Sequence, residues 1–184
     1  METVVLSTVK HHAAIVGSTA SHRDNGSDGT RSVRVRWPDE AATQAFAEAL
    51  ARQPALRNTF IALQGTLGAG KTTLVRHLLR ALGVQGRIKS PTYAVVEPHE
   101  VPGLQIWHFD FYRFNDPREW EDAGFRDIFA SPGLKLAEWP DQAGGMLPTP
   151  DLVIAIEPTG DTAREATLSA GTDAGMALVR AVAA

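Results

Sequence analysis

Hydrophobic and polar residues alternate at the start of the regular part of the chain and then give way to short apolar runs. From Val33 to Trp37, apolar residues alternate with Arg34 and Arg36, the pattern of a half-exposed strand. Thr59–Gln64 is apolar except at its two ends, which is typical of a buried strand. Further strands are expected at Tyr93–Glu97, Leu104–Asp110, Leu134–Glu138, Leu152–Glu157 and Ala166–Ala170.

Helical patterns lie between these strands. Asp39 is expected to cap a helix that continues to about Gln53. A second helix, with leucines along one face, follows a glycine-rich stretch and ends at Gly83. A capping box that begins at Asp116 predicts a short helix, and Asp173–Val182 predicts the last one. Strands mixed with helices in this way favour a three-layer α/β domain around a mainly parallel sheet.

The glycine-rich stretch has the form of a phosphate-binding loop. Gly65–Thr72 reads GTLGAGKT and matches G-x-x-x-x-G-K-[ST] in full. Its glycines permit backbone conformations that a Cβ would forbid, so that successive N–H groups can curl around phosphate. Lys71 is expected to reach the β- and γ-phosphates, and the Thr72 hydroxyl to ligate Mg²⁺. The motif predicts a single P-loop NTPase-type domain, but it does not choose among switches, kinases, motors and transferases. The residues expected to line ATP are Gly65, Thr66, Leu67, Gly68, Ala69, Gly70, Lys71, Thr72 and Thr73.

Two carboxylates end neighbouring predicted strands. Asp110 closes one strand and Glu138 closes another, where P-loop enzymes need a carboxylate to hold the water shell of Mg²⁺. Glu138 could instead polarise the attacking water. Thr92 lies in the segment KSPTY, where P-loop proteins often place a nucleotide-sensing switch, although a simple proline turn is an open alternative. His108 is interpreted as a packed strand residue.

Composition narrows the function classes. The 184 residues include no cysteine, which excludes disulfides, thiolate catalysis and a cysteine-rich zinc site. The net charge of −3 argues against tight direct binding of tRNA or DNA. No apolar run approaches the roughly 20 residues that span a bilayer, and a cytoplasmic location is expected. Residues 1–32 are expected to be a flexible N-terminal extension, and residues 33–184 the P-loop ATPase domain.

Four motifs in order resemble one family. LGAGKTT at 67–73, KSPTY at 89–93, HFDFYR at 108–113 and EWP at 138–140 are similar to the bacterial TsaE (YjeE) family of P-loop ATPases in tRNA threonylcarbamoyladenosine biosynthesis. The resemblance implies weak, partner-dependent hydrolysis of MgATP. It also implies service to a complex of a threonylcarbamoyl transferase subunit and its fold-related partner, which modifies adenosine 37 of tRNAs that read ANN codons. Contact with tRNA would be indirect.

The resemblance also implies residue roles. Lys71, Asp110 and Glu138 would be catalytic, and the metal ligands would be Thr72, Glu138 and Asp110. Thr92 would belong to the switch and Trp139 to the site. The stretch from Pro38 to Thr43, which includes Glu40, would flank the nucleotide base together with Arg164. Ala163 stands before this arginine where the family usually has glycine, so the base contact is the least supported part of the assignment.

Three other readings remain open. A small-molecule kinase would need an arginine lid, for which Arg113, Arg118 and Arg126 are available. A regulatory GTPase would carry the guanine-reading motif N-K-x-D, which is absent from this sequence. An interaction protein with an inactive nucleotide site is disfavoured because the residues expected for phosphate and metal binding are all present.

Overall fold

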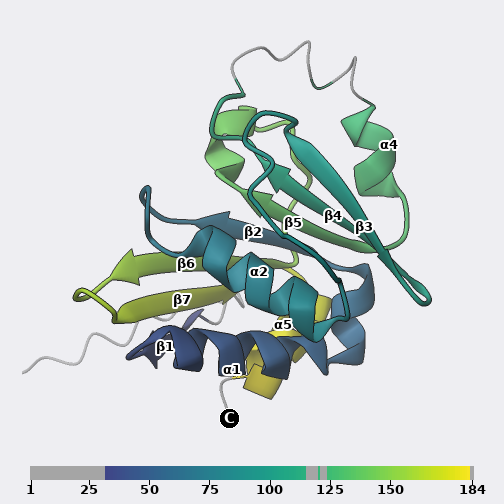
Figure 1. Ribbon diagram of the computed structural model, residues 1–184. Helices are drawn as coiled ribbons and strands as arrows, with labels where there is room; N and C mark the ends of the chain where they lie inside the picture. The colour runs from purple at the N-terminus through teal and green to yellow at the C-terminus, as the bar shows by residue number, and fades with distance from the viewer. Residues whose placement is uncertain (1–31, 115–119, 121–123, 183–184) are drawn as a thin grey trace, which may run out of the picture.

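The computed structural model describes residues 32–114, 120 and 124–182 (Figure 1). The elements in chain order are β1 (Ser32–Trp37), α1 (Glu40–Ala51), η1 (Pro54–Asn58), β2 (Phe60–Gln64), α2 (Lys71–Ala81), β3 (Val96–Val101), β4 (Leu104–Asp110), α4 (Phe125–Ala130), β5 (Leu134–Glu138), η2 (Pro140–Ala143), β6 (Leu152–Pro158), β7 (Arg164–Ala170) and α5 (Asp173–Val182). Here η denotes a short 3₁₀ helix.

Most predicted elements are present. Strands β4 and β5 have the predicted bounds, and Asp39 caps α1 by accepting a hydrogen bond of 2.9 Å from the Ala42 N–H. The 3₁₀ helix η1 and the helix α4 were not predicted. The helix expected to begin at Asp116 and the expected N-terminal extension, apart from Ser32, lie outside the described residues.

The strand predicted at Tyr93–Glu97 has the wrong bounds, because β3 begins only at Val96 and continues to Val101. The chain turns between Pro91 and Val95, where the Val95 N–H donates to the Pro91 carbonyl at 2.7 Å. Val95 has a φ of 63°, a left-handed conformation that is rare for a β-branched residue and incompatible with a strand. The apolar residues that suggested a strand here therefore belong to a tight turn.

The sheet has seven strands in the order β1-β7-β6-β2-β5-β4-β3. Its central strands, β6, β2, β5 and β4, run parallel, whereas β3 and β7 are antiparallel to their neighbours. This central block confirms the prediction of a mainly parallel sheet. In such a sheet the carboxyl ends of the parallel strands meet at one edge, where ligands commonly bind.

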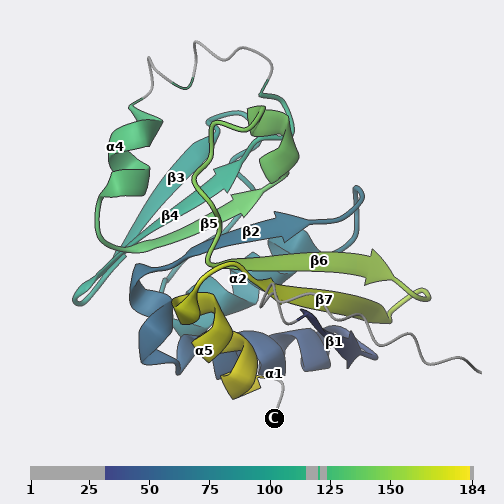
Figure 2. The ribbon, with the colours of Figure 1, turned by 180° about the vertical axis from the view of Figure 1, so that it is seen from behind.

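Two hydrophobic clusters cover the two faces of the sheet. On one face, α1, α2 and α5 pack on apolar residues such as Ile61, Ile106 and Leu136. On the other, α4 and η2 cover an aromatic cluster that includes Phe109 and Phe111 (Figures 1 and 2). The three-layer prediction is confirmed. Within the described part of the chain, no helix combines the length and apolar character needed to cross a membrane.

Candidate nucleotide-binding site

Strand alternation brings the two predicted carboxylates together. Asp110 and Glu138 are register partners at the carboxyl ends of β4 and β5, and Glu138 is also paired with Leu63 of β2. Leu136, two residues before Glu138, packs in the α1–α2–α5 cluster, so Glu138 also faces α2. Both carboxylate residues are buried, with 4% of Asp110 and 2% of Glu138 exposed. Two buried carboxylates thus lie beside the start of α2.

The loop between β2 and α2 depends on glycine at both ends. Gly65 has a φ of 137°, and a Cβ there would lie 2.4 Å from the Ile156 carbonyl oxygen of β6. Gly70 has a φ of 110° and stands immediately before the first residue of α2. The loop therefore approaches the sheet closely and directs the amino-terminal end of an 11-residue helix toward the pocket, the arrangement that favours phosphate.

Lys71 is the first residue of α2, and its side chain packs against this loop. Its ammonium donates hydrogen bonds to the carbonyls of Gly65 at 2.7 Å and Thr66 at 2.9 Å, and it lies 3.9 Å from the centre of the Trp139 ring. Burial lowers the pKa of Lys71, while the negative charges of Glu138 and Asp110 oppose this effect. A cation that is held by carbonyls and a ring face is well placed to exchange those contacts for phosphate oxygens.

Trp139 has an unusual backbone conformation beside the lysine. Its φ of 57° is left-handed, which costs a non-glycine residue about 1–3 kcal/mol. Its ring packs 5.0 Å from the ring of Tyr112, measured between centroids. This conformation places the indole over Lys71. The strained residue is thus the tryptophan that follows Glu138 in the EWP motif.

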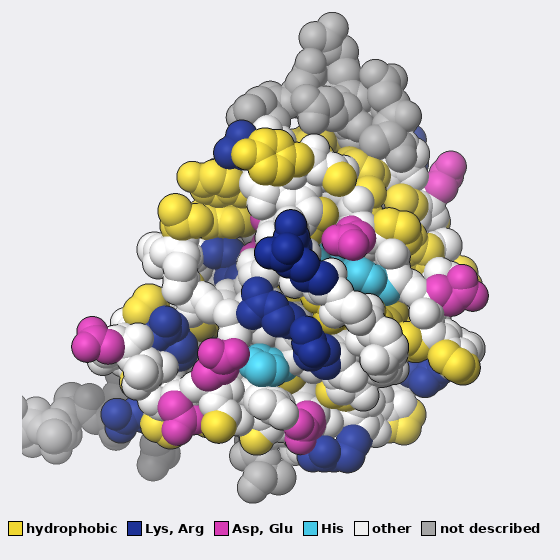
Figure 3. All heavy atoms as spheres, viewed as in Figure 1, with side chains coloured by type: hydrophobic (Ala, Val, Ile, Leu, Met, Phe, Trp, Pro, Cys, Tyr) yellow, Lys and Arg dark blue, Asp and Glu magenta, His cyan; other side chains and the backbone are white. Residues whose placement is uncertain are grey.

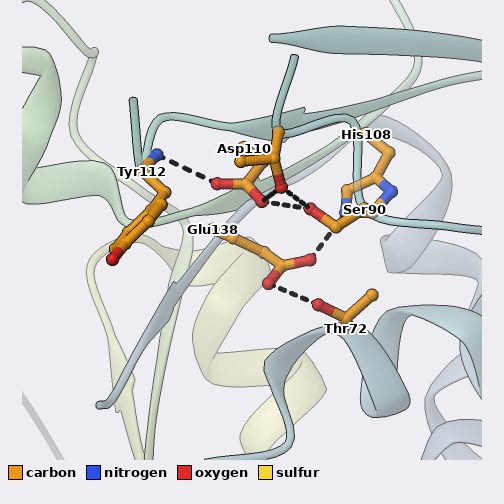
Figure 4. A network of polar contacts seen from close by, with 7 residues as sticks. Thr72, Ser90, His108, Asp110, Tyr112 and Glu138 are labelled. Carbon is orange, nitrogen blue, oxygen red and sulfur yellow. Dashed lines mark hydrogen bonds and ion pairs between the residues drawn. The ribbon is translucent and has the colours of Figure 1, made fainter. Parts of the chain in front are cut away.

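Glu138 connects α2 to the sheet (Figure 4). Its Oε2 accepts a hydrogen bond from the Thr72 hydroxyl at 2.8 Å, and its Oε1 lies 2.9 Å from Nε2 of His108. The first residues of α2 and the ends of β4 and β5 therefore form one polar network.

Asp110 holds the predicted switch segment. Its Oδ2 accepts hydrogen bonds from the hydroxyls of Ser90 and Thr92, the latter at 2.8 Å. Its Oδ1 accepts from the backbone N–H of Tyr112 at 2.9 Å. The carboxylate thus ties the KSPTY segment to the strand end (Figure 4).

Two pockets adjoin each other at Gly70 and Thr73. The first, here called the phosphate pocket, has a volume of about 330 Å³ and is lined by Leu67, Gly68, Gly70, Lys71, Thr72, Thr73, Ser90, Thr92, Asp110, Tyr112, Glu138 and Trp139. The second, called the α1 pocket, has a volume of about 240 Å³ and is lined by Trp37, Asp39, Glu40, Thr43, Ala69, Gly70, Thr73, Asp161, Thr162 and Arg164.

Most of the predicted site residues line these two pockets. The loop residues Leu67, Gly68, Gly70, Lys71, Thr72 and Thr73 meet Asp110, Thr92, Glu138 and Trp139 at the phosphate pocket. Ala69 lines the α1 pocket, whereas Gly65 and Thr66 line neither. Glu40 and Arg164 lie in the α1 pocket, on the other side of the loop.

The sequence analysis assigned no site role to three residues that hydrogen-bond to Asp110 or Glu138. Ser90 adjoins Thr92 in its motif, and Tyr112 follows Asp110 by two residues. His108 precedes Asp110 by two residues and therefore lies on the same strand face. This spacing was the available signal for His108.

The donor chemistry fits Mg²⁺ with a nucleotide. Thr72, Glu138 and Asp110 supply oxygen donors, which Mg²⁺ prefers, and it commonly completes its shell with water and substrate phosphate. Among the described residues no group of three or more His, Cys, Asp or Glu could hold a metal alone. A site that shares its ion with phosphate therefore fits better than an all-protein metal cage.

Comparisons with known proteins agree with the geometry. A sequence profile described as "Threonylcarbamoyl adenosine biosynthesis protein TsaE" matches residues 37–166. The tRNA threonylcarbamoyladenosine biosynthesis protein TsaE of Haemophilus influenzae is 40% identical over 148 residues, 78% of this chain and 93% of the relative. The Bacillus subtilis protein of the same name is 34% identical over 141 residues, 74% of this chain and 86% of the relative. A crystal structure of YdiB from Bacillus subtilis superposes with a TM-score of 0.68 at 26% identity, covering 85% of this chain and 97% of that one.

Proposed function

The chain belongs to the TsaE family of tRNA threonylcarbamoyladenosine biosynthesis proteins, and from this premise we propose that it binds and slowly hydrolyses MgATP. Hydrolysis supports repeated turnover of the two-protein threonylcarbamoyl transferase complex. The product of that complex is N6-threonylcarbamoyladenosine at position 37 of ANN-decoding tRNAs. The same proposal implies a cytoplasmic protein, because ATP and the tRNA pool are cytoplasmic.

The observation that carries the proposal is that the buried cation of Lys71, the Thr72 hydroxyl and the buried carboxylates of Asp110 and Glu138 all line the phosphate pocket. Lys71 would bind phosphate oxygens, and Thr72 with Glu138 would hold Mg²⁺. When bound, Mg²⁺ would neutralise charge on the phosphate oxygens and favour cleavage of the terminal phosphate. Glu138 would also orient the attacking water, because its buried carboxylate lines the phosphate pocket beside Thr72.

Coupling to partners follows from the contacts of Asp110. Asp110 lines the phosphate pocket and holds both Thr92 and the backbone of Tyr112, so its contacts would respond to phosphate and Mg²⁺ bound beside it. The nucleotide state is thereby transmitted to the segment 89–93 and to the surface beside it. Order and disorder of such segments are a common nucleotide switch.

That surface has the character of a protein-binding face. The exposed large hydrophobic residues of the described chain are Leu67, Tyr93 and Tyr112, which are 75%, 86% and 43% exposed. Two of them line the phosphate pocket and Tyr93 adjoins Thr92. Hydrophobic side chains gather above the start of α2 in Figure 3. Exposed aromatic residues at a pocket rim favour binding to a partner.

The kinase alternative is less well supported. Lys71 is the single cation among the described residues that line the phosphate pocket. Arg113 stacks on Tyr93, with its guanidinium carbon 4.5 Å from the ring centre, and Arg118 lies outside the described residues. The described residues that line the phosphate pocket therefore do not support an arginine lid that would clamp a transferred phosphoryl group.

The decisive experiment is multiple-turnover threonylcarbamoyl transfer to tRNA by the purified partner pair, with and without this chain and MgATP. We expect turnover to depend strongly on the chain and to be lost with Lys71→Ala. Lys135→Met is the matched control, because Lys135 is equally buried, with 4% exposed, but lies outside the two pockets. Turnover that is independent of the chain would overturn the proposed role while leaving nucleotide binding to be judged separately.

A further inference from the structure

A buried histidine, His108, contacts Glu138 on the side away from the phosphate pocket. The side chain of His108 has no exposed surface, and its Nε2 lies 2.9 Å from Oε1 of Glu138 (Figure 4). His108 does not line the pocket, so it would not touch the nucleotide. Its only hydrogen-bond partner among the described residues is this carboxylate.

The sheet register explains this contact. His108 is paired with Leu136 across β4 and β5, and Glu138 stands two residues further along β5. The two side chains are therefore diagonal neighbours on the face that α2 covers. The contact is built into the strand pairing and does not depend on a loop.

The contact constrains the orientation of the carboxylate. A carboxylate accepts hydrogen bonds only, so Nε2 of His108 is assigned as the donor to Oε1. Oε2 of Glu138 accepts from the Thr72 hydroxyl at 2.8 Å. One oxygen is thus held from the sheet and the other from the helix, and rotation of the carboxylate would break at least one bond.

Packing alone does not account for a histidine at this position. Its Nδ1 is buried and has no hydrogen-bond partner among the described residues. Ile106, the preceding residue on the same strand face, is a fully buried apolar residue. A leucine would fill such a position without leaving a buried nitrogen unpaired.

We propose that His108 is a positioning residue for Glu138: its Nε2–H holds Oε1 so that Oε2 stays directed at Thr72 and the metal-binding side of the phosphate pocket. This inference rests on the proposed function, because the value of the orientation lies in assembling the site for MgATP. Residues that orient metal ligands commonly change metal affinity by about 10–100-fold when replaced.

The first test needs no ligand. Long-range proton–nitrogen NMR spectra of the full chain report which ring nitrogen of His108 carries a proton. We expect the proton on Nε2 in the wild type. A ring whose Nε2 carries no proton would overturn the proposal, whatever the chain does with nucleotide.

The second test compares His108→Leu with His108→Gln, whose side-chain amide can donate from nearly the same place as Nε2. ATP binding is measured with excess chelator and across a Mg²⁺ titration. We expect His108→Leu to raise the Mg²⁺ concentration for half-maximal binding about tenfold, with metal-free affinity unchanged. His108→Gln should recover most of the loss. His99→Leu is the control, because this neighbouring histidine is also on the β3–β4 pair and its buried Nε2 has no hydrogen-bond partner among the described residues.

The outcomes separate the two proposals. Equal losses with and without Mg²⁺, or no recovery in His108→Gln, would overturn the positioning role. Wild-type protein that does not bind MgATP would overturn the proposed function itself. If His108→Leu does not fold, as judged by thermal unfolding, the glutamine variant and the NMR measurement still decide the matter.

Discussion

The phosphate pocket and the α1 pocket adjoin the same loop but are built differently. In the phosphate pocket, Glu138 and Asp110 are almost wholly buried and bonded to Thr72 and Thr92. In the α1 pocket, the side chain of Glu40 is 68% exposed. Charges that water does not screen interact strongly, whereas exposed charges contribute little each. The phosphate pocket is therefore expected to supply most of the affinity, and the α1 pocket smaller adjustments.

The largest expected effect is that of Lys71→Ala. Removal of the buried cation leaves phosphate oxygens without their charged partner, and MgATP affinity should fall about 100-fold, or about 2.7 kcal/mol. Isothermal titration calorimetry measures this, with Lys135→Met as the control. A loss smaller than about threefold would contradict the greater weight given to the phosphate pocket.

Glu138→Ala should separate turnover from binding. Loss of the group that orients water and helps to hold the metal should slow ATP hydrolysis about 100-fold. ATP affinity should fall by less than about tenfold because Lys71 and the loop remain. Steady-state hydrolysis and equilibrium binding are measured on the same preparation. Unimpaired hydrolysis would exclude the metal and catalytic roles assigned to Glu138.

Arg164→Ala tests the α1 pocket. Arg164 donates from Nε to the Ala69 carbonyl at 2.9 Å, so it links β7 to the phosphate-binding loop. Its loss should weaken ATP binding by about 5–10-fold, the value of roughly one ordinary hydrogen bond. Arg34→Ala is the matched control, because Arg34 is exposed and paired with Glu165 on the same strand pair. A loss as large as that of Lys71→Ala would remove the distinction between the pockets.

The smallest expected effect is on the pH dependence of stability, and it comes from Lys135, a buried lysine outside both pockets. Burial lowers the pKa of Lys135 from the ordinary value of 10.5, while Asp151 opposes the shift. Between the lowered pKa and 10.5 the unfolded chain binds more protons than the folded one, so the stability contribution of Lys135 increases as pH rises through that window. Urea unfolding at increasing alkaline pH should show this rise in the wild type and a weaker one in Lys135→Met. Identical pH profiles would contradict it.

Local sequence determined the parts of the site that are contiguous in the chain. The phosphate-binding loop is readable because each step of its backbone path, including the left-handed Gly65 and Gly70, is encoded within eight residues. Alternation and short apolar runs likewise located β4 and β5 and placed Asp110 and Glu138 at their ends. These features depend on backbone conformation and on side-chain period, which neighbouring residues control.

Tertiary structure alone decided which distant groups meet. The turn at Val95 displaced β3 because hydrogen bonds to Pro91 and Asp110 hold an unfavourable φ that local propensity opposes. The α1 pocket combines residues near 40 with residues near 164, and the contact of His108 with Glu138 follows from the register of β4 against β5. Such partnerships arise from strand order and from the burial of charge, and neither property is encoded in any one segment of the sequence.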